Sequence, residues 1–128
     1  MACQATNDIL KLSNGLDVKV ITAVGGTRLQ DTLQQLKDPF NVIIGTPGRL
    51  VDLINMNSLT LEDVNFVGLE DYDRIRMIGL ETMISEIFNS LSIHTRLLIS
   101  SSSLDFLDWN SLKKYVSSPS DFEILKTY

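Results

Sequence analysis

Short apolar runs of strand length alternate along this chain with segments of helical spacing, and a turn residue marks each switch. Strand-like runs lie at 18–24, 41–44, 64–69, 96–100 and 122–125. Strands that alternate with helices form right-handed βαβ units, which build a mostly parallel sheet. The sequence therefore predicts an α/β fold in which helices flank a mostly parallel sheet.

Turn and capping residues place the helices between these runs. Asn14-Gly15 supplies a left-handed stop for a helix that ends near Leu12, and Thr27 can cap the next helix. Thr46 before Pro47 is typical of an N-cap followed by proline in the first turn. Further helices are predicted over 80–91 and 106–116.

The composition limits the number of domains and the kinds of binding that this chain can have. The chain has 128 residues, 44% of them hydrophobic, which suits one globular domain over residues 1–128 with a real core. Its net charge of -5 argues against non-specific binding to a phosphate backbone, because such binding depends on a basic surface field. Any contact with nucleic acid must therefore be local.

Cysteine usage and the N-terminus indicate an intracellular setting. Cys3 is the only cysteine, which excludes an intramolecular disulfide and a cysteine-rich zinc site. The first residues lack the basic run and apolar stretch of a secretory signal, and no apolar segment approaches the roughly 20 residues that cross a bilayer. We expect no membrane partner; cytoplasm, nucleus and organelle matrix are not distinguished.

Glycine, serine and acidic residues follow four of the predicted strands. These segments are Gly25-Gly26, Gly45 to Arg49, Glu70 to Asp73, and Ser100 to Ser103. In parallel sheets, function gathers in the loops beyond the carboxyl ends of the strands. The topology therefore predicts that the four segments lie at one edge.

The segment Gly45-Thr46-Pro47-Gly48-Arg49-Leu50 suits contact with a phosphate. Gly45 and Gly48 allow close approach, the helix start after Thr46 offers N–H donors, and Arg49 adds a charge-assisted fork. The alternative interpretation is that Thr46-Pro47 is simply a good helix start and Arg49 a solvated side chain.

In this order and spacing, the segments resemble the first RecA-like domain, of P-loop NTPase type, of the DEAD-box RNA helicases. The likeness covers nearly the whole chain: Val24 to Thr27 is similar to the family's double-glycine element, and Gly45 to Leu50 contains its TPGR motif unchanged. Leu69 to Arg74 lies where the family has its Asp-Glu-Ala-Asp box, and Ser100 to Ser102 where it has Ser-Ala-Thr. Met1 to Gln4 is similar to the end of the family's Pro-Thr-Arg-Glu-Leu-Ala-x-Gln motif.

The resemblance implies an RNA site made by Gly25, Gly26, Thr46, Gly48 and Arg49. In the family, these elements hold the sugar-phosphate backbone through main-chain N–H groups, a threonine hydroxyl and an arginine.

The acidic box departs from the family pattern. There, the first Asp helps to hold magnesium, the Glu orients the attacking water, and the last Asp couples to Ser-Ala-Thr. The corresponding residues are Glu70, Asp71 and Asp73, so the first two side chains have exchanged lengths. One methylene moves a carboxylate by about 1.5 Å, and a misplacement near 1 Å can cost roughly a hundredfold in rate. We expect a solvated, helix-capping acidic turn with no metal, in which Ser100 or Ser102 keeps a structural hydroxyl link to Asp73.

No Gly-x-x-x-x-Gly-Lys-Ser/Thr loop occurs in the sequence. The resemblance places the glutamine motif and the phosphate loop before Met1 and the second RecA-like domain after Tyr128. We expect a non-catalytic module of an RNA-handling assembly that binds RNA backbone or protein and needs no cofactor. One alternative is a fragment of an ATP-dependent RNA helicase, which would use ATP and magnesium; another is a purely structural subunit.

The same resemblance has a consequence for the sheet. In the RecA-like arrangement, the strand that leads into the phosphate loop lies beside the Ser-Ala-Thr strand. An exposed edge in a parallel sheet is costly and invites pairing with another chain. A protein partner, self-association or the rest of a longer protein is therefore expected to complete the sheet.

Overall fold

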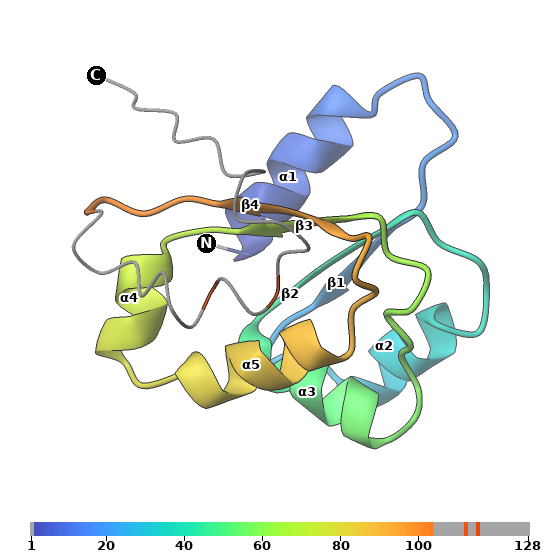
Figure 1. The fold of residues 1–128 in the computed structure, drawn as a ribbon. Coiled ribbons are helices and arrows are strands. Elements are labelled where there is room, and N and C mark those ends of the chain that lie inside the picture. The colour runs from blue at the N-terminus through green and yellow to red at the C-terminus, as the bar shows by residue number, and fades with distance from the viewer. Residues whose placement is uncertain (1, 104–111, 113–114, 116–128) are drawn as a thin grey trace. The chain divides into compact units, whose positions relative to one another are not determined.

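The computed structural model describes residues 2–103, 112 and 115. Figure 1 shows its helices and strands. In chain order these are α1 (Ala2–Leu12), β1 (Val20–Ala23), α2 (Leu29–Gln35), β2 (Val42–Gly45), α3 (Pro47–Asn55), β3 (Phe66–Leu69), α4 (Tyr72–Met77), α5 (Glu81–Asn89) and β4 (Arg96–Ile99). The chain divides into two compact units, with the boundary between Thr60 and Leu61.

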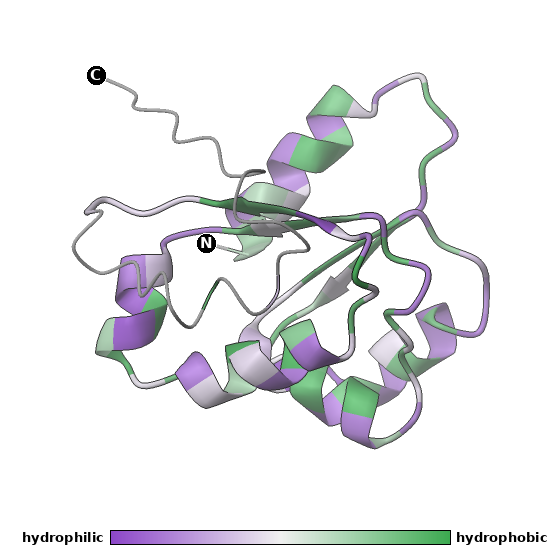
Figure 2. Cartoon of the chain, viewed as in Figure 1, coloured by the Kyte–Doolittle hydropathy of each residue, from purple (hydrophilic) through white to green (hydrophobic). Residues whose placement is uncertain are grey.

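The first unit is built on the parallel pair β1–β2. The register runs from Val20 opposite Val42 to Ala23 opposite Gly45, so both strands end at the same level. Most of their residues are apolar, as Figure 2 shows, and β-branched residues favour the extended backbone. Ile21 and Ala23 are completely buried, and α1 and α2 both contact β1.

An N-cap residue and a proline set the start of α3 in this unit. Thr46 is the N-cap, with extended backbone at φ -81° and ψ 147°, and Pro47 occupies the first turn, as predicted. Val51 and Leu53 from this helix are buried, and Leu53 is completely inaccessible. The apolar face of α3 thus anchors the segment that follows β2.

The second unit is built on the parallel pair β3–β4. Its register runs from Phe66 opposite Arg96 to Leu69 opposite Ile99. In α5, Ile84, Ile87 and Phe88 are buried at helical spacing. The Phe88 ring meets the ring of Tyr115 edge to face, with centroids 4.9 Å apart and an interplanar angle of 76°.

The predicted α/β class with parallel strands and flanking helices is confirmed. A strand lies in each of the first four predicted runs, but the described strands form two parallel pairs, β1–β2 and β3–β4.

The helix α4 was not predicted, because its six residues are too few to show a clear apolar period. The predicted helix over 106–116 and strand over 122–125 lie almost wholly outside the described residues. The single domain over 1–128 stays a prediction.

Candidate nucleic-acid interface

A tight turn carries the two glycines that follow β1. The Thr27 N–H donates to the Val24 carbonyl at 3.4 Å, and the Thr27 hydroxyl donates to the same oxygen at 2.8 Å. Gly26 has φ 90°, a left-handed conformation that favours glycine. Both glycines are exposed, and a Cβ added at either would meet no atom of the chain within 4 Å. The turn therefore presents bare main chain on its outer side.

The predicted helix cap at Thr27 was wrong. The N-cap of α2 is Arg28, and its side chain makes no capping hydrogen bond. The Thr27 hydroxyl bonds back to Val24 instead, because a threonine hydroxyl can satisfy a nearby carbonyl in a turn. Thr27 thus belongs to the double-glycine turn.

Close contact joins the end of β2 to the end of β1. The Thr46 N–H donates to the Ala23 carbonyl at 3.1 Å. A Cβ at Gly45 would lie 2.7 Å from that same carbonyl oxygen and 2.8 Å from Leu50 Cδ2. Only glycine fits without a shift at position 45, so Gly45 allows the segment after β2 to lie against the segment after β1.

The start of α3 keeps several polar groups available. The first hydrogen bond across this turn runs from the Leu50 N–H to the Thr46 carbonyl at 3.1 Å. The N–H groups of Gly48 and Arg49 precede it and have no acceptor within the helix, while Pro47 has no N–H. Thr46 is exposed, and its hydroxyl makes no capping hydrogen bond. Two main-chain donors and one hydroxyl therefore lie at the positive end of the helix dipole.

Arg49 ties this helix start to the double-glycine turn. Its Nη2 donates to the Thr27 carbonyl at 3.0 Å, across 22 residues of sequence. The Ala23 and Thr27 carbonyls thus each accept a hydrogen bond from the segment after β2. The structure brings together the five residues predicted to hold RNA: Gly25, Gly26, Thr46, Gly48 and Arg49. We call the surface made by Gly25 to Thr27 and Thr46 to Arg49 the glycine-arginine surface.

Sequence reasoning missed the Thr27 carbonyl as the partner of Arg49. A main-chain acceptor carries no sequence signal, and its partner is distant in the chain. Only the register that sets Ala23 beside Gly45 brings the two turns close enough for this contact.

The acidic turn Glu70 to Asp73 lies in the second unit, and its backbone differs from that of the helix start at Thr46. Asp71 is the N-cap of α4 with φ 50° and ψ 51°, a left-handed conformation that is uncommon for a residue with a side chain. Its N–H donates to the Ser100 hydroxyl at 3.2 Å, and the Tyr72 N–H donates to the Ser100 carbonyl at 2.9 Å. A helix starts at this acidic turn as predicted, but no side-chain capping bond forms, and Asp73 is buried although the turn was predicted to be solvated. The cap depends on main chain and on Ser100.

Asp73 and Ser102 form the predicted hydroxyl link. Asp73 is buried, its Oδ2 accepts a hydrogen bond from the Ser102 hydroxyl, and its Oδ1 accepts one from the Ser102 N–H at 3.4 Å. The Ser102 hydroxyl, helped by main-chain N–H groups, lowers the pKa of Asp73 from its ordinary value of 3.8, while burial acts in the opposite direction. Asp73 is therefore a structural carboxylate held by the segment after β4.

The three carboxylates of this turn do not converge. Glu70 is exposed, Asp71 lies 3.9 Å from Arg74 Nη1, and Asp73 is bonded to Ser102. In the part of the chain that the structure describes, no three His, Cys, Asp or Glu side chains are grouped to hold a metal ion. Tyr72, where the family has alanine, is buried. We derive no hydrolytic step from this turn.

The Asp73 link predicts an acid-dependent loss of stability. A depressed folded pKa stabilises the protein above the unfolded pKa, near 3.8, and this contribution is lost as pH falls through the folded value. We expect Ser102→Ala to lower the melting temperature at neutral pH and to shift the Asp73 pKa upward in a carboxyl NMR titration. The difference from the unchanged chain should shrink below pH 3.8.

The matched control for this prediction is Ser101→Ala. The Ser101 hydroxyl donates to the Ser103 carbonyl at 2.8 Å, a contact with no titrating partner. Its effect on stability should not vary with pH. An unchanged Asp73 pKa in Ser102→Ala would show that the hydroxyl is not what holds this carboxylate.

Comparison with known proteins identifies the family of this chain. The family model for DEAD/DEAH box helicases matches residues 1–107. The chain belongs to the DEAD/DEAH box helicase family. This DEAD/DEAH box chain is 38% identical over 94 residues to the pre-mRNA-processing ATP-dependent RNA helicase PRP5 of Lodderomyces elongisporus, a match that covers 71% of the chain and 10% of that protein. It is 28% identical over 126 residues to the probable ATP-dependent RNA helicase MJ0669 of Methanocaldococcus jannaschii, covering 98% of the chain and 33% of the relative.

Solved structures agree with this fold. The crystal structure of a DEAD box protein from the hyperthermophile Methanococcus jannaschii matches with a TM-score of 0.83 and 28% identity, over 91% of this DEAD/DEAH box chain and 32% of that one. The structure of a hypothetical ATP-dependent RNA helicase from Sulfolobus tokodaii matches with a TM-score of 0.79 at 19% identity, which shows the fold alone.

The two relatives named above are much longer than this DEAD/DEAH box chain. It spans between 10% and 33% of their length. Among the described residues, none of the helices has the length and apolar character that crossing a membrane requires.

Proposed function

We propose that this chain binds the sugar-phosphate backbone of RNA through the glycine-arginine surface. The observation that carries the proposal is the Arg49 contact with the Thr27 carbonyl at 3.0 Å, which holds both glycine-containing segments in one place. The residues assigned to the site are Gly25, Gly26, Thr46, Gly48 and Arg49. Their shared location in one compact unit supports a single binding surface.

The chemistry of the surface suits a backbone rather than bases. Exposed main chain at Gly25 and Gly26 lets a phosphate come close, because neither residue has a side chain. The N–H groups of Gly48 and Arg49 and the Thr46 hydroxyl are donors that phosphate oxygens accept. Contacts of this type set position and affinity but do not read sequence. We expect binding with little dependence on base identity.

We also propose that the chain does not hydrolyse ATP by itself. The exchanged lengths of Glu70 and Asp71, the left-handed backbone at Asp71 and the commitment of Asp73 to Ser102 all support this. The absence of a Gly-x-x-x-x-Gly-Lys-Ser/Thr stretch in the sequence supports it further, since that loop grips the phosphates of ATP.

ATP with magnesium is therefore expected to leave the thermal melt of this chain unchanged. A ligand at a hundred times its dissociation constant would stabilise the folded state by roughly 2.7 kcal/mol. Differential scanning fluorimetry with ATP and magnesium, and with magnesium alone as the control, makes the comparison. A shift that requires ATP would contradict the non-catalytic proposal.

A second candidate is a fragment of an ATP-dependent RNA helicase. Both curated relatives carry that description, and the chain spans at most 33% of their length. In that setting, ATP and magnesium would be held with residues outside this sequence, while the glycine-arginine surface would keep its role. The full reading frame of the gene decides between the two: a phosphate loop upstream of Met1 would establish the helicase.

A third candidate is a structural subunit without RNA contact. It is favoured if Arg49 serves only to brace the turn that ends at Thr27. RNA binding that is indifferent to the loss of Arg49 would support it.

We further propose that a protein partner or a second copy covers part of the second unit. Phe66 in β3 and Leu98 in β4 are 59% and 56% exposed, and the register places them on the same face of the strand pair. Light scattering tests the proposal, since a monodisperse monomer with a cooperative melt would remove it.

A further inference from the structure

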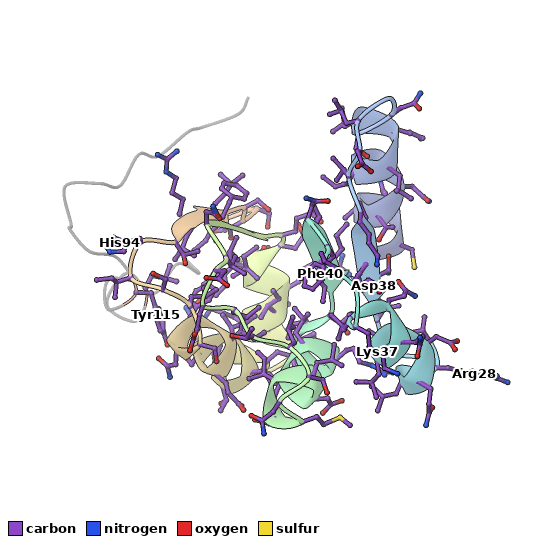
Figure 3. The ribbon with its side chains drawn as sticks, turned by 90° about the vertical axis from the view of Figure 1, so that its right-hand side faces the viewer. Arg28, Lys37, Asp38, Phe40, His94 and Tyr115 are labelled. Carbon is purple, nitrogen blue, oxygen red and sulfur yellow. The ribbon has the colours of Figure 1, made fainter. Side chains whose placement is uncertain are left out.

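Arg28 comes directly after the double-glycine turn. It is exposed, and Figure 3 shows its side chain extending away from the ribbon at the start of α2. Its backbone is extended, with φ -63° and ψ 127°. The side chain therefore leaves the protein surface next to Gly25 and Gly26.

Three other cations of the first unit are engaged by groups of the protein itself. Lys19 Nζ lies 3.4 Å from Asp38 Oδ2, Lys37 Nζ donates to Gln34 Oε1 at 3.0 Å, and Arg49 Nη2 donates to the Thr27 carbonyl. Within the described residues, the Arg28 guanidinium takes part in no hydrogen bond or ion pair. Among these residues, none occupies the five N–H donors that the Arg28 guanidinium can offer to a ligand.

Arg49 and Arg28 act on the same peptide group. The carbonyl that Arg49 holds belongs to Thr27, and the nitrogen of that peptide bond belongs to Arg28. Because a peptide unit is planar, fixing the carbonyl also fixes the direction in which the Arg28 backbone starts. Arg49 therefore fixes the backbone from which the Arg28 side chain extends, relative to the exposed glycines.

We propose that Arg28, which directly follows the first segment of the glycine-arginine surface, is a cation that contacts phosphate beside it, and that Arg49 is the positioning residue that orients Arg28. The ligand class is the backbone phosphate of single-stranded RNA, and the inference rests on the proposed RNA-binding function. A guanidinium pairs with phosphate oxygens through two parallel hydrogen bonds. The net charge of -5 gives the chain no general attraction for RNA, so a correctly placed cation contributes much of the electrostatic part of binding.

The dependence of RNA affinity on salt distinguishes the two arginines. Each phosphate neutralised on a single strand contributes about -0.7 to the slope of log affinity against log salt concentration. Arg28→Gln is expected to weaken binding and to flatten that slope by about 0.7. Arg49→Gln is expected to weaken binding with the slope nearly unchanged, because it removes a contact within the protein.

Lys37→Gln is the matched control. It removes one positive charge from the same unit, at the opposite end of α2 from Arg28, as Figure 3 shows. Its slope and affinity should equal those of the unchanged chain. Arg28→Lys keeps the charge and is expected to keep most of the slope. Circular dichroism melts should coincide for all Arg28 and Lys37 variants, since both side chains are exposed.

The measurement is fluorescence anisotropy of a labelled oligouridylate over a series of salt concentrations, with the full 128-residue chain. An Arg28→Gln slope equal to that of the unchanged chain would overturn the role of Arg28 and leave the proposed function in place. Equal flattening in Lys37→Gln would also overturn it, because the effect would then be one of net charge. An unchanged chain that fails to bind the oligouridylate would overturn both the inference and the proposed function.

Discussion

Gly45→Val is expected to abolish RNA binding and to lower the free energy of unfolding by about 1–3 kcal/mol. The first added atom, Cβ, would lie 2.7 Å from the Ala23 carbonyl oxygen and 2.8 Å from Leu50 Cδ2. The carbonyl is main chain and already accepts the Thr46 N–H at 3.1 Å, so it cannot move aside without loss of that bond. Separation of the two segments would carry Arg49 away from the Thr27 carbonyl.

Thermal melts and anisotropy with an oligouridylate measure the two parts of this prediction. For a domain of this size, each 1 kcal/mol corresponds to a shift of roughly 2–8 °C in melting temperature. The matched control is Gly68→Val in β3, where an added Cβ would meet only Phe66 Cε1, at the ordinary contact distance of 3.9 Å. That control should melt within a few degrees of the unchanged chain and bind RNA equally well. A Gly45→Val variant that melts and binds like the unchanged chain would show that the packing of these two segments is not needed.

Arg49→Ala is expected to lower RNA affinity about tenfold, which corresponds to about 1.4 kcal/mol. The substitution removes the 3.0 Å hydrogen bond to the Thr27 carbonyl and with it the tie between the double-glycine turn and α3. The effect on stability should be small, because the contact is exposed. The affinity of an oligouridylate at fixed salt gives the measurement.

Arg76→Ala is the control for this second prediction. It removes the same side chain from the second unit, where Arg76 Nε lies 2.5 Å from Glu81 Oε1. It should leave RNA affinity unchanged. If both variants bind as well as the unchanged chain, Arg49 is only a brace, and the structural-subunit interpretation replaces the RNA-binding proposal.

Much of the fold could be predicted because its determinants are local. The β-branched runs predict the strands, and Thr46-Pro47 predicts the start of α3, since each depends on the preferences of neighbouring residues. The parallel arrangement follows from alternation with helices. The short helix α4 and the left-handed backbone at Asp71 could not be predicted in this way. They depend on hydrogen bonds that the Asp71 and Tyr72 N–H groups donate to the hydroxyl and the carbonyl of Ser100, which is distant in the sequence.

Some features of the candidate site could likewise be predicted from the sequence, and others could not. The phosphate-contacting chemistry of Gly45 to Arg49 was predicted from residue types, while the RNA site with Gly25 and Gly26 and the link between Asp73 and Ser102 were implied by the family resemblance. The partner of Arg49 was not found, because any main-chain carbonyl could accept its hydrogen bond. The assignment of Thr27 as a helix cap failed for a related reason: its hydroxyl had an equally local acceptor in the Val24 carbonyl, and this bond forms in the structure.

The central claim is that RNA backbone lies on the glycine-arginine surface. Amide chemical shifts from ¹H–¹⁵N spectra, recorded during titration of this chain with an oligouridylate, test it most directly. We predict that the amides of Gly25, Gly26, Gly48 and Arg49 shift most, while those of β3 and β4 stay unchanged. Titration without amide shifts, or with shifts centred on Glu70 to Asp73, would contradict the claim.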